Sequence, residues 1–162
     1  MSNVFVVEYK ALDPVLGLFG PALTTRINTF AKEHYPEGDP DLLTRQFLAR
    51  TVAADPFIKI LIVASPEGKL VGHCVATLDQ HGEKRWIYGW QLEIDGKQEG
   101  AVEQVIAHLE NWGMETGASN LIMTTHRSER AWQRKYNFES RHAVMTRPIP
   151  YVKDVVVSEL RE

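Results

Sequence analysis

The chain has 162 residues, 24% of them charged and 44% hydrophobic, with a formal net charge of −3 and an isoelectric point near 6.1. This length fits one domain, and the slightly acidic balance argues against a general nucleic-acid binder, whose phosphate contacts need a basic surface. Cys74 is the only cysteine, so no intrachain disulfide can form. The sequence shows no secretory signal and no apolar run near the ~20 residues that span a bilayer. We therefore expect a cytoplasmic protein that does not enter a membrane.

The first third of the chain predicts a strand followed by two helices. Residues 4–9 are apolar and β-branched, as in a strand. Asp13-Pro14 is typical of a helix start, with a capping side chain followed by proline at the first helical position. Apolar residues at helical spacing then define a first helix that Pro21 begins or kinks, with an inward face of Leu23, Ile27, Phe30 and Ala31. After a break at 36–40, a second helix is expected to bury Leu43, Phe47, Leu48 and Val52.

From residue 57 the spacing of hydrophobic residues changes from that of helices to that of strands. Turn residues at 65–68 and 80–84 separate three strand-like segments, which predicts an antiparallel meander. These segments are residues 57–64, 69–78 and 85–95.

Helical spacing returns after Gly96. The apolar face of this helix is formed by Val102, Val105, Ile106, Leu109 and Trp112. A short apolar strand at 120–125 follows, so the third meander strand, this helix and this strand predict a parallel crossover. A helix at 128–136 and a strand at 141–149 complete the order. The sequence thus predicts one α+β domain over residues 1–150, with a mixed, mostly antiparallel central sheet flanked by helices. Residues 151–162 are expected to form a tail or an edge strand.

Two segments carry a family resemblance. The run VIAHLENWGMETGASNLIMTT, at 105–125, has a Leu-Glu-x-Trp helix and a glycine turn that leads into a strand. The run AWQRKYNFES, at 131–140, matches a Y-x-x-x-G-F-E segment except that Asn137 replaces the glycine. Asparagine is the next-best residue for a left-handed position after a helix. Together with the order of elements, these segments resemble the GNAT superfamily of acyl-CoA-dependent N-acyltransferases. The resemblance implies transfer of an acetyl group from acetyl-CoA to an amine of a small molecule or a protein.

In this family an R/Q-x-x-G-x-G/A motif binds acyl-CoA, because unpaired N–H groups of the first helical turn face the pyrophosphate. Lys97 keeps the positive charge of the motif and Gly100 leaves room for phosphate oxygens. Glu99 adds a negative charge, and Val102 stands where glycine or alanine is usual. The same residues also fit a plain strand-to-helix turn, in which Glu99 is a favourable acid and Val102 begins the buried face. The matching positions are Lys97, Gln98, Glu99, Gly100, Ala101 and Val102.

Strand alternation bears on the catalytic and acyl-binding groups. It places Gln91 and Glu93 on one face of the strand at 85–95. The resemblance makes Glu93 the candidate base, because partial burial beside a cleft would strengthen it; an exposed strand carboxylate is the alternative. The resemblance also implies that the backbone of Leu92 and Ile94 pairs with the pantetheine arm. The opposite face is predicted to carry Trp86, Tyr88, Trp90, Leu92 and Ile94.

The segment at 126–135 is basic. The resemblance makes Arg130 and Arg134 candidates for the 3′-phosphate of CoA, whereas the alternative is a solvated helix face. Gln133 occupies the position of the family's tyrosine acid, so water or the leaving thiolate itself would have to suffice. His73 and Cys74 point to opposite faces of a strand and form no dyad, and no Cys/His spacing suggests a metal site.

Two hypotheses remain. The first is an N-acetyltransferase that uses acetyl-CoA. The second is a catalytically inactive GNAT-like binding or assembly module, favoured by Val102, Glu99 and the missing tyrosine. In that module the tail at 151–162 and the four tryptophans would contact a protein partner or a second copy of the chain.

Overall fold

The computed structural model describes residues 3–123 and 129–139. The chain divides into two compact units, Met1–His126 and Arg127–Glu162, and each is considered by itself. The first unit contains β1 (Phe5–Glu8), a 3-10 helix (Leu16–Phe19), α1 (Gly20–His34), α2 (Pro40–Val52), β2 (Ile58–Ala64), β3 (Leu70–His81), β4 (Lys84–Ile94), α3 (Ala101–Thr116) and β5 (Asn120–Met123).

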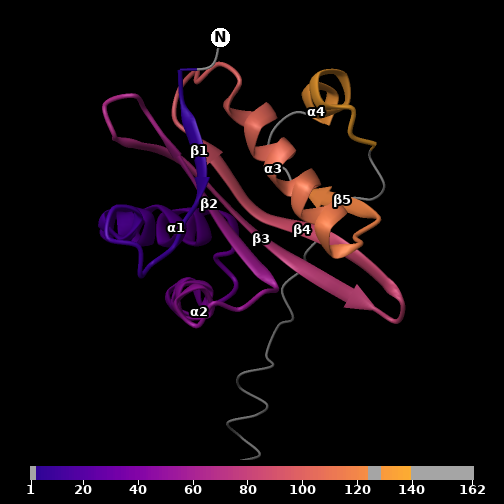
Figure 1. Cartoon of the computed structure of the whole chain (residues 1–162), viewed down its shortest axis with the longest axis horizontal. Helices are drawn as coiled ribbons and strands as arrows, with labels where there is room; N and C mark the ends of the chain where they lie inside the picture. Colours follow the sequence, from indigo (N-terminus) through magenta and orange to yellow (C-terminus); the bar gives the residue numbers. More distant parts are fainter. Residues whose placement is uncertain (1–2, 124–128, 140–162) are drawn as a thin grey trace, which may run out of the picture. The chain divides into compact units, whose positions relative to one another are not determined.

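The five strands form one sheet in the order β1-β2-β3-β4-β5 (Figure 1). The first three pairings are antiparallel, and β4 pairs with β5 in parallel. The predicted meander and the predicted parallel crossover through α3 are therefore confirmed, as is the α+β class with a mostly antiparallel sheet.

Helices cover both faces of this sheet: α1 and α2 lie on one face and α3 on the other (Figure 1). We call the two apolar cores the α3-face cluster and the α1–α2-face cluster. The α3-face cluster contains Val4, Val6, Leu61, Val63, Val71, Cys74, Ala76, Leu78, Ile87, Ile94, Ala101, Val105, Leu109 and Trp112. The α1–α2-face cluster contains Tyr9, Leu23, Ile27, Phe47, Ile58, Ile60, Ile62, Leu70 and Val75.

The β3–β4 turn is tighter than predicted. Because β3 extends to His81 and β4 begins at Lys84, only Gly82 and Glu83 connect them. Two-residue hairpin turns require positive φ, and Gly82 has φ 62°. The strands consequently pair almost to their tips.

Two predictions about the helices are wrong: a helix start at Asp13-Pro14 and the burial of Val52. The first helix begins at Gly20 with Pro21 in its first turn, which confirms the prediction that Pro21 begins it. The carboxylate of Asp13 accepts from the N–H groups of Val15 and Leu16, so it caps only the short 3-10 turn. Val52 is 54% exposed, because it is the last residue of α2 and the buried face of that helix ends one turn earlier.

The second unit contains α4 (Glu129–Tyr136), which confirms the helix predicted there. Asn137 follows with φ 56°, the left-handed conformation expected of the residue that replaces the family glycine. Trp132 is buried and contacts the rings of Tyr136 and Phe138. The strand predicted at 141–149 and the tail at 151–162 lie outside the described residues, and the single domain over 1–150 stays a prediction.

Candidate functional site

A β-bulge at Trp90 reorganises the middle of β4. Val75 of β3 pairs with Gln91, whereas the next residue, Ala76, pairs with Gly89. Trp90 is thus the extra residue, and such an insertion shifts the alternation of side chains by one position.

The bulge overturns the predicted face of the strand. Leu92 and Ile94 contact the α3-face cluster, whereas Trp90 packs on the α1–α2-face cluster. The ring of Tyr88 stands edge-on to that of Trp90, with 5.0 Å between centroids. The prediction that Leu92 and Ile94 share a face with Trp90 is therefore wrong, because it assumed an uninterrupted period of two.

Beyond the bulge, one backbone edge of β4 lies outside the pairing with β3. On that edge β5 pairs with β4 from Trp86 to Gly89, and the partner of Gly89 is Met123, the last residue described before the gap at 124–128. The N–H of Asp95 donates to the carbonyl of Val71 at 2.8 Å. Because residues of antiparallel strands alternate between hydrogen-bonded and non-hydrogen-bonded pairs, Leu92 and Ile94 direct their backbone groups away from β3. These are the groups that were predicted to pair with a pantetheine arm, and they lie on the edge of β4 opposite β3.

The strand-to-helix junction follows directly. Gly100 has φ 75°, which favours glycine, and precedes α3 without any side-chain cap. The N–H of Ala101 donates to the carbonyl of Gln98 at 3.2 Å. The N–H groups of Val102 and Glu103 have no protein acceptor among the described residues. A helix start of this kind presents backbone donors and the positive end of the helix dipole to an anion.

Side chains at the junction support both interpretations of residues 97–102, as an acyl-CoA motif and as a plain strand-to-helix turn. Lys97 is exposed and supplies a cation, but Glu99 is exposed as well, and Glu103 adds an acid to the first helical turn. Val102 is half-buried and packs against the α3-face cluster. The valine therefore contributes to the core, as the plain-turn alternative predicts, while its backbone N–H remains without a protein partner.

Glu93 is held in an ion pair. Its carboxylate lies 3.2 Å from a terminal nitrogen of Arg26, and the second terminal nitrogen of Arg26 lies 2.9 Å from the carboxylate of Asp95. The side chain of Arg26 is only 15% exposed, that of Glu93 33% and that of Asp95 54%. Glu93 is therefore paired and partly exposed, and it does not have the unpaired, buried setting expected of a base.

The same arginine continues into a buried hydrogen-bond chain. Its Nε donates to Nδ1 of His73 at 3.4 Å, and Nε2 of His73 lies 2.7 Å from Oε1 of Gln91. Gln91 donates in turn to the carbonyl of Ile27 at 3.3 Å. Burial lowers the pKa of His73 from 6.5 to about 4, so the ring is neutral near pH 7 and carries its proton on Nε2. We call Arg26, His73, Gln91, Glu93 and Asp95 the Arg26 network.

Sequence reasoning missed this network, although one signal was present. Arg26 lies three residues after Leu23 and four before Phe30, and it therefore falls on the buried face of α1. A charged side chain on a predicted buried face needs a partner. The partners, however, lie 47 to 69 residues further along the chain.

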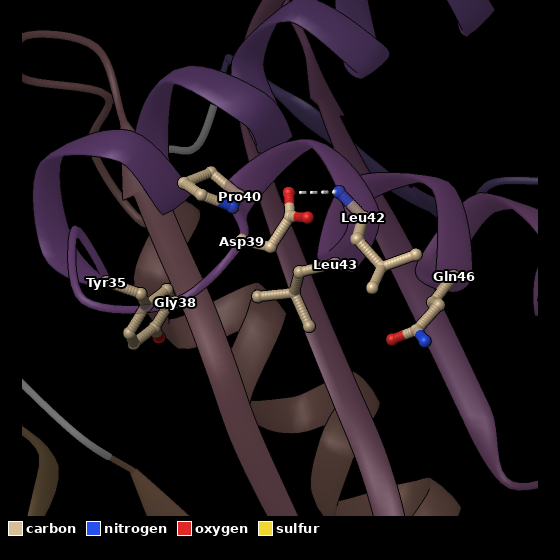
Figure 2. Close-up of a pocket in the computed structure, with 7 residues that line it drawn as sticks. All are labelled: Tyr35, Gly38, Asp39, Pro40, Leu42, Leu43 and Gln46. Atoms are coloured by element: carbon tan, nitrogen blue, oxygen red, sulfur yellow. Dashed lines mark hydrogen bonds between the residues drawn. The ribbon is translucent and has the colours of Figure 1, made fainter. Parts of the chain in front are cut away.

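A shallow hollow of about 240 Å³ lies where α1 leads into α2 (Figure 2). Its walls include Tyr35, Leu42, Leu43 and Gln46, and Asp39 on its rim caps α2 by accepting from the N–H of Leu42.

Tyr35 connects this hollow to the bulge. Its hydroxyl donates to the carbonyl of Trp90, and its ring stands edge-on to the indole of Trp90. Burial, with a smaller contribution from the charge of Tyr88, raises the pKa of Tyr35 to about 12. The phenol is therefore neutral near pH 7, and it satisfies a carbonyl at the point where the sheet pairing is interrupted.

The remaining predicted residues lie in the second unit. Arg130, Gln133 and Arg134 are all exposed on α4, and the proposed contact of the two arginines with a 3′-phosphate stays a prediction. Across residues 3–123 and 129–139, no group of three His, Cys, Asp or Glu side chains is placed to hold a metal ion. Nor is any helix in those ranges long and apolar enough to cross a membrane.

Comparisons with known proteins establish the fold. No protein-family model matches the sequence, and no curated protein does. Among solved structures, AAC(6′)-Iy in complex with the bisubstrate analogue CoA-S-monomethyl-acetylneamine is similar, at TM-score 0.62 and 16% identity over 91% of this chain and 99% of that one. An aminoglycoside acetyltransferase from an uncultured soil metagenomic sample gives TM-score 0.61 and 20% identity over 93% and 99%. Glucosamine-6-phosphate N-acetyltransferase from Arabidopsis thaliana gives TM-score 0.61 and 8% identity over 90% and 97%. The chain therefore has the fold of the GNAT acetyltransferases.

Proposed function

We propose that this GNAT-fold protein is an N-acyltransferase that moves an acetyl group from acetyl-CoA to a primary amine of a small molecule or a protein. One observation carries the proposal: the backbone groups of Leu92 and Ile94 point away from β3, directly before the uncapped start of α3. Backbone groups for an acyl arm, at Leu92 and Ile94, and backbone donors for phosphates, at Val102 and Glu103, thus follow one another along the chain. AAC(6′)-Iy, which has the same fold, was solved with an analogue that contains CoA, and this supports the choice of CoA.

The residues present fit such a ligand. Leu92 and Ile94 offer N–H and C=O groups on the edge of β4 opposite β3, where an extended amide-containing arm would bind like an added strand. The junction that follows offers the N–H groups of Val102 and Glu103 to the pyrophosphate, with Lys97 as a nearby cation. Gly100 leaves space at this turn because it has no Cβ.

The acceptor would approach from the α1–α2 side, past Tyr35 and Trp90. Acetyl-CoA supplies the acyl group as a thioester, so attack by the unprotonated amine forms the N–C bond as the C–S bond breaks. Glu93, on this side of the sheet, would receive the amine proton directly or through water. Because Glu93 is already paired with Arg26, the chain would depend mainly on positioning its substrates.

The alternative, a GNAT-fold binding module without catalysis, is favoured by the charges at the junction. Glu99 and Glu103 flank the backbone donors, with Lys97 as the cation in the same stretch. These carboxylates would repel phosphates and weaken CoA binding.

Calorimetric titration with acetyl-CoA separates the two functions. The acyltransferase proposal predicts saturable binding below millimolar concentration and acetylation of amines in a panel assay. Absence of binding at millimolar acetyl-CoA would leave the binding module as the function.

The Val102→Ala variant then tests the motif. Because the valine packs on the α3-face cluster, we expect CoA affinity to change by less than about twofold while the free energy of unfolding falls by about 1 kcal/mol. A gain in affinity of tenfold or more would show instead that the valine obstructs the site.

A further inference from the structure

The Arg26 network joins three elements at the end of β4. Arg26 lies on α1, His73 on β3, and Gln91 and Glu93 on β4, with Asp95 one residue beyond that strand. Exposure rises along the chain of contacts, from fully buried His73 and Gln91 to the half-exposed Asp95. The network thus runs from the core of the α1–α2 face to the first residue of the strand-to-helix junction.

Every nitrogen of the Arg26 guanidinium is used. Nε donates to His73, one terminal nitrogen donates to both carboxylate oxygens of Asp95 at 3.0 and 2.9 Å, and the other reaches the side chain and the carbonyl of Glu93 at 3.2 and 3.4 Å. A planar guanidinium with all its donors engaged fixes the orientation of its partners more strictly than an ammonium could. The arginine therefore holds both the backbone and the side chains of β4 at its end.

Two buried polar side chains, His73 and Gln91, hold the Arg26 side chain in place. The neutral ring of His73 accepts from Nε, and Gln91 ties that ring to the backbone of α1 at Ile27. Such a second layer of hydrogen bonds orients a side chain that would otherwise choose among several rotamers.

The network also changes the charge beside the junction. Between residues 93 and 103 the chain carries four carboxylates, at Glu93, Asp95, Glu99 and Glu103, and one cation, Lys97. Arg26 is a second cation, brought by α1 against Glu93 and Asp95. Without it, both of those carboxylates would add to the repulsion felt by a phosphate at the junction.

We propose that Arg26 is a positioning residue for acyl-CoA: it fixes the end of β4 and the start of the junction, and it offsets the carboxylates there, without contacting the ligand. This inference rests on the proposed function, since it assigns a role within the same acyl-CoA site. The far end of the junction is anchored separately, by buried Ala101 and half-buried Val102 at the start of α3.

Calorimetric titration with coenzyme A tests the assignment, with melting temperature measured in parallel. We expect Arg26→Ala to weaken the Kd for coenzyme A by about tenfold or more, the size of loss seen when residues that orient metal ligands are removed. Arg26→Lys keeps the charge but not the forked contacts, so its loss should be smaller than that of Arg26→Ala.

Arg50→Ala is the matched control. Arg50 pairs with Asp55 at 2.7 Å where α2 ends, far along the chain from the junction, and its loss also removes a charged arginine–aspartate contact. We expect it to lower the melting temperature without changing the Kd. If Arg26→Ala behaves in the same way, Arg26 has only a structural role and the proposal is overturned.

The double variant Arg26→Ala/Glu99→Gln separates geometry from charge. It has the net charge of the wild-type chain but lacks the guanidinium, so positioning predicts that binding stays weaker than in the wild type. Full recovery of the wild-type Kd would show that Arg26 acts only through its charge, and it would overturn the proposal that Arg26 positions the end of β4. Failure of the wild-type protein itself to bind coenzyme A would instead refute the proposed function.

Discussion

The two faces of the sheet differ in the kind of side chain that they bury. The α3-face cluster consists of apolar side chains only. The α1–α2 face also buries polar groups: His73 and Gln91 in the Arg26 network, Thr77 under Trp90, and Thr44 on α2. Apolar packing stabilises without demanding direction, whereas each buried polar group needs a partner at a set distance and angle. The polar face is therefore the one that can place a strand end and a bulge accurately, and it holds the β4 end of the candidate site, whereas the start of α3 packs on the apolar cluster.

Breaking the apolar face should have the largest effect on stability. Leu109 of α3 is 1% exposed in the α3-face cluster, so Leu109→Ala should lower the free energy of unfolding by about 3 kcal/mol, through lost burial and the cavity left behind. Urea denaturation measures this loss. A cost under about 1 kcal/mol would show that this face tolerates cavities and is not the main source of stability.

The polar face should respond to acid where the apolar face does not. Because burial depresses the pKa of His73 to about 4 from 6.5, the unfolded chain binds the extra proton first as the pH falls. The stability owed to neutral His73 is thus complete above pH 6.5 and is lost progressively toward pH 4, by up to about 3 kcal/mol. Unfolding of the wild type and of His73→Asn over this range measures the difference, with exposed His81→Asn as the control. Parallel pH profiles for wild type and His73→Asn would contradict the assignment.

Exchanging threonine and valine, which have similar shapes, compares the two faces of the sheet through smaller effects. Thr77 accepts from the indole N–H of Trp90 at 2.9 Å, so Thr77→Val leaves a donor unpaired and should cost about 1–2 kcal/mol despite its added apolar group. The reverse change, Val63→Thr, buries a hydroxyl in the apolar cluster and should cost a similar amount, about 1–2 kcal/mol. Thermal unfolding of both variants compares the faces directly. An increase in stability for Thr77→Val would mean that the polar contact is dispensable.

Much of the fold was predictable because it follows from local chemistry. Hydrophobic periods of two and 3.6 located β2 to β4 and α3, and the turn at Ser65–Gly68 has the expected bond from the N–H of Gly68 to the carbonyl of Ser65 at 2.9 Å. Asn137 likewise adopts the left-handed conformation that its place after a helix demands. These features depend on residues a few positions apart, so the sequence contains what is needed to infer them.

The errors arose where local rules compete with packing. Asp13-Pro14 has the chemistry of a helix start, yet its cap serves a 3-10 turn, and Gly20-Pro21 begins the helix instead. The bulge at Trp90 has no signature in the alternation of β4, because the strand pattern is regular on either side of it. Only the pairing with β3, and the hydroxyl of Tyr35 that satisfies the Trp90 carbonyl, identify the extra residue.

The sequence by itself determined the order of strands and helices, the parallel crossover and the place of the strand-to-helix junction. Periodicity and turn chemistry act over short stretches of chain, and each of these features depends on such stretches. Tertiary structure alone decided which face each β4 side chain occupies. It also brought Arg26 of α1 into contact with Glu93 and Asp95 at the end of that strand. These contacts join residues 47 to 69 positions apart. Directional bonds over such separations form only after the sheet and α1 have packed, so no local pattern encodes them.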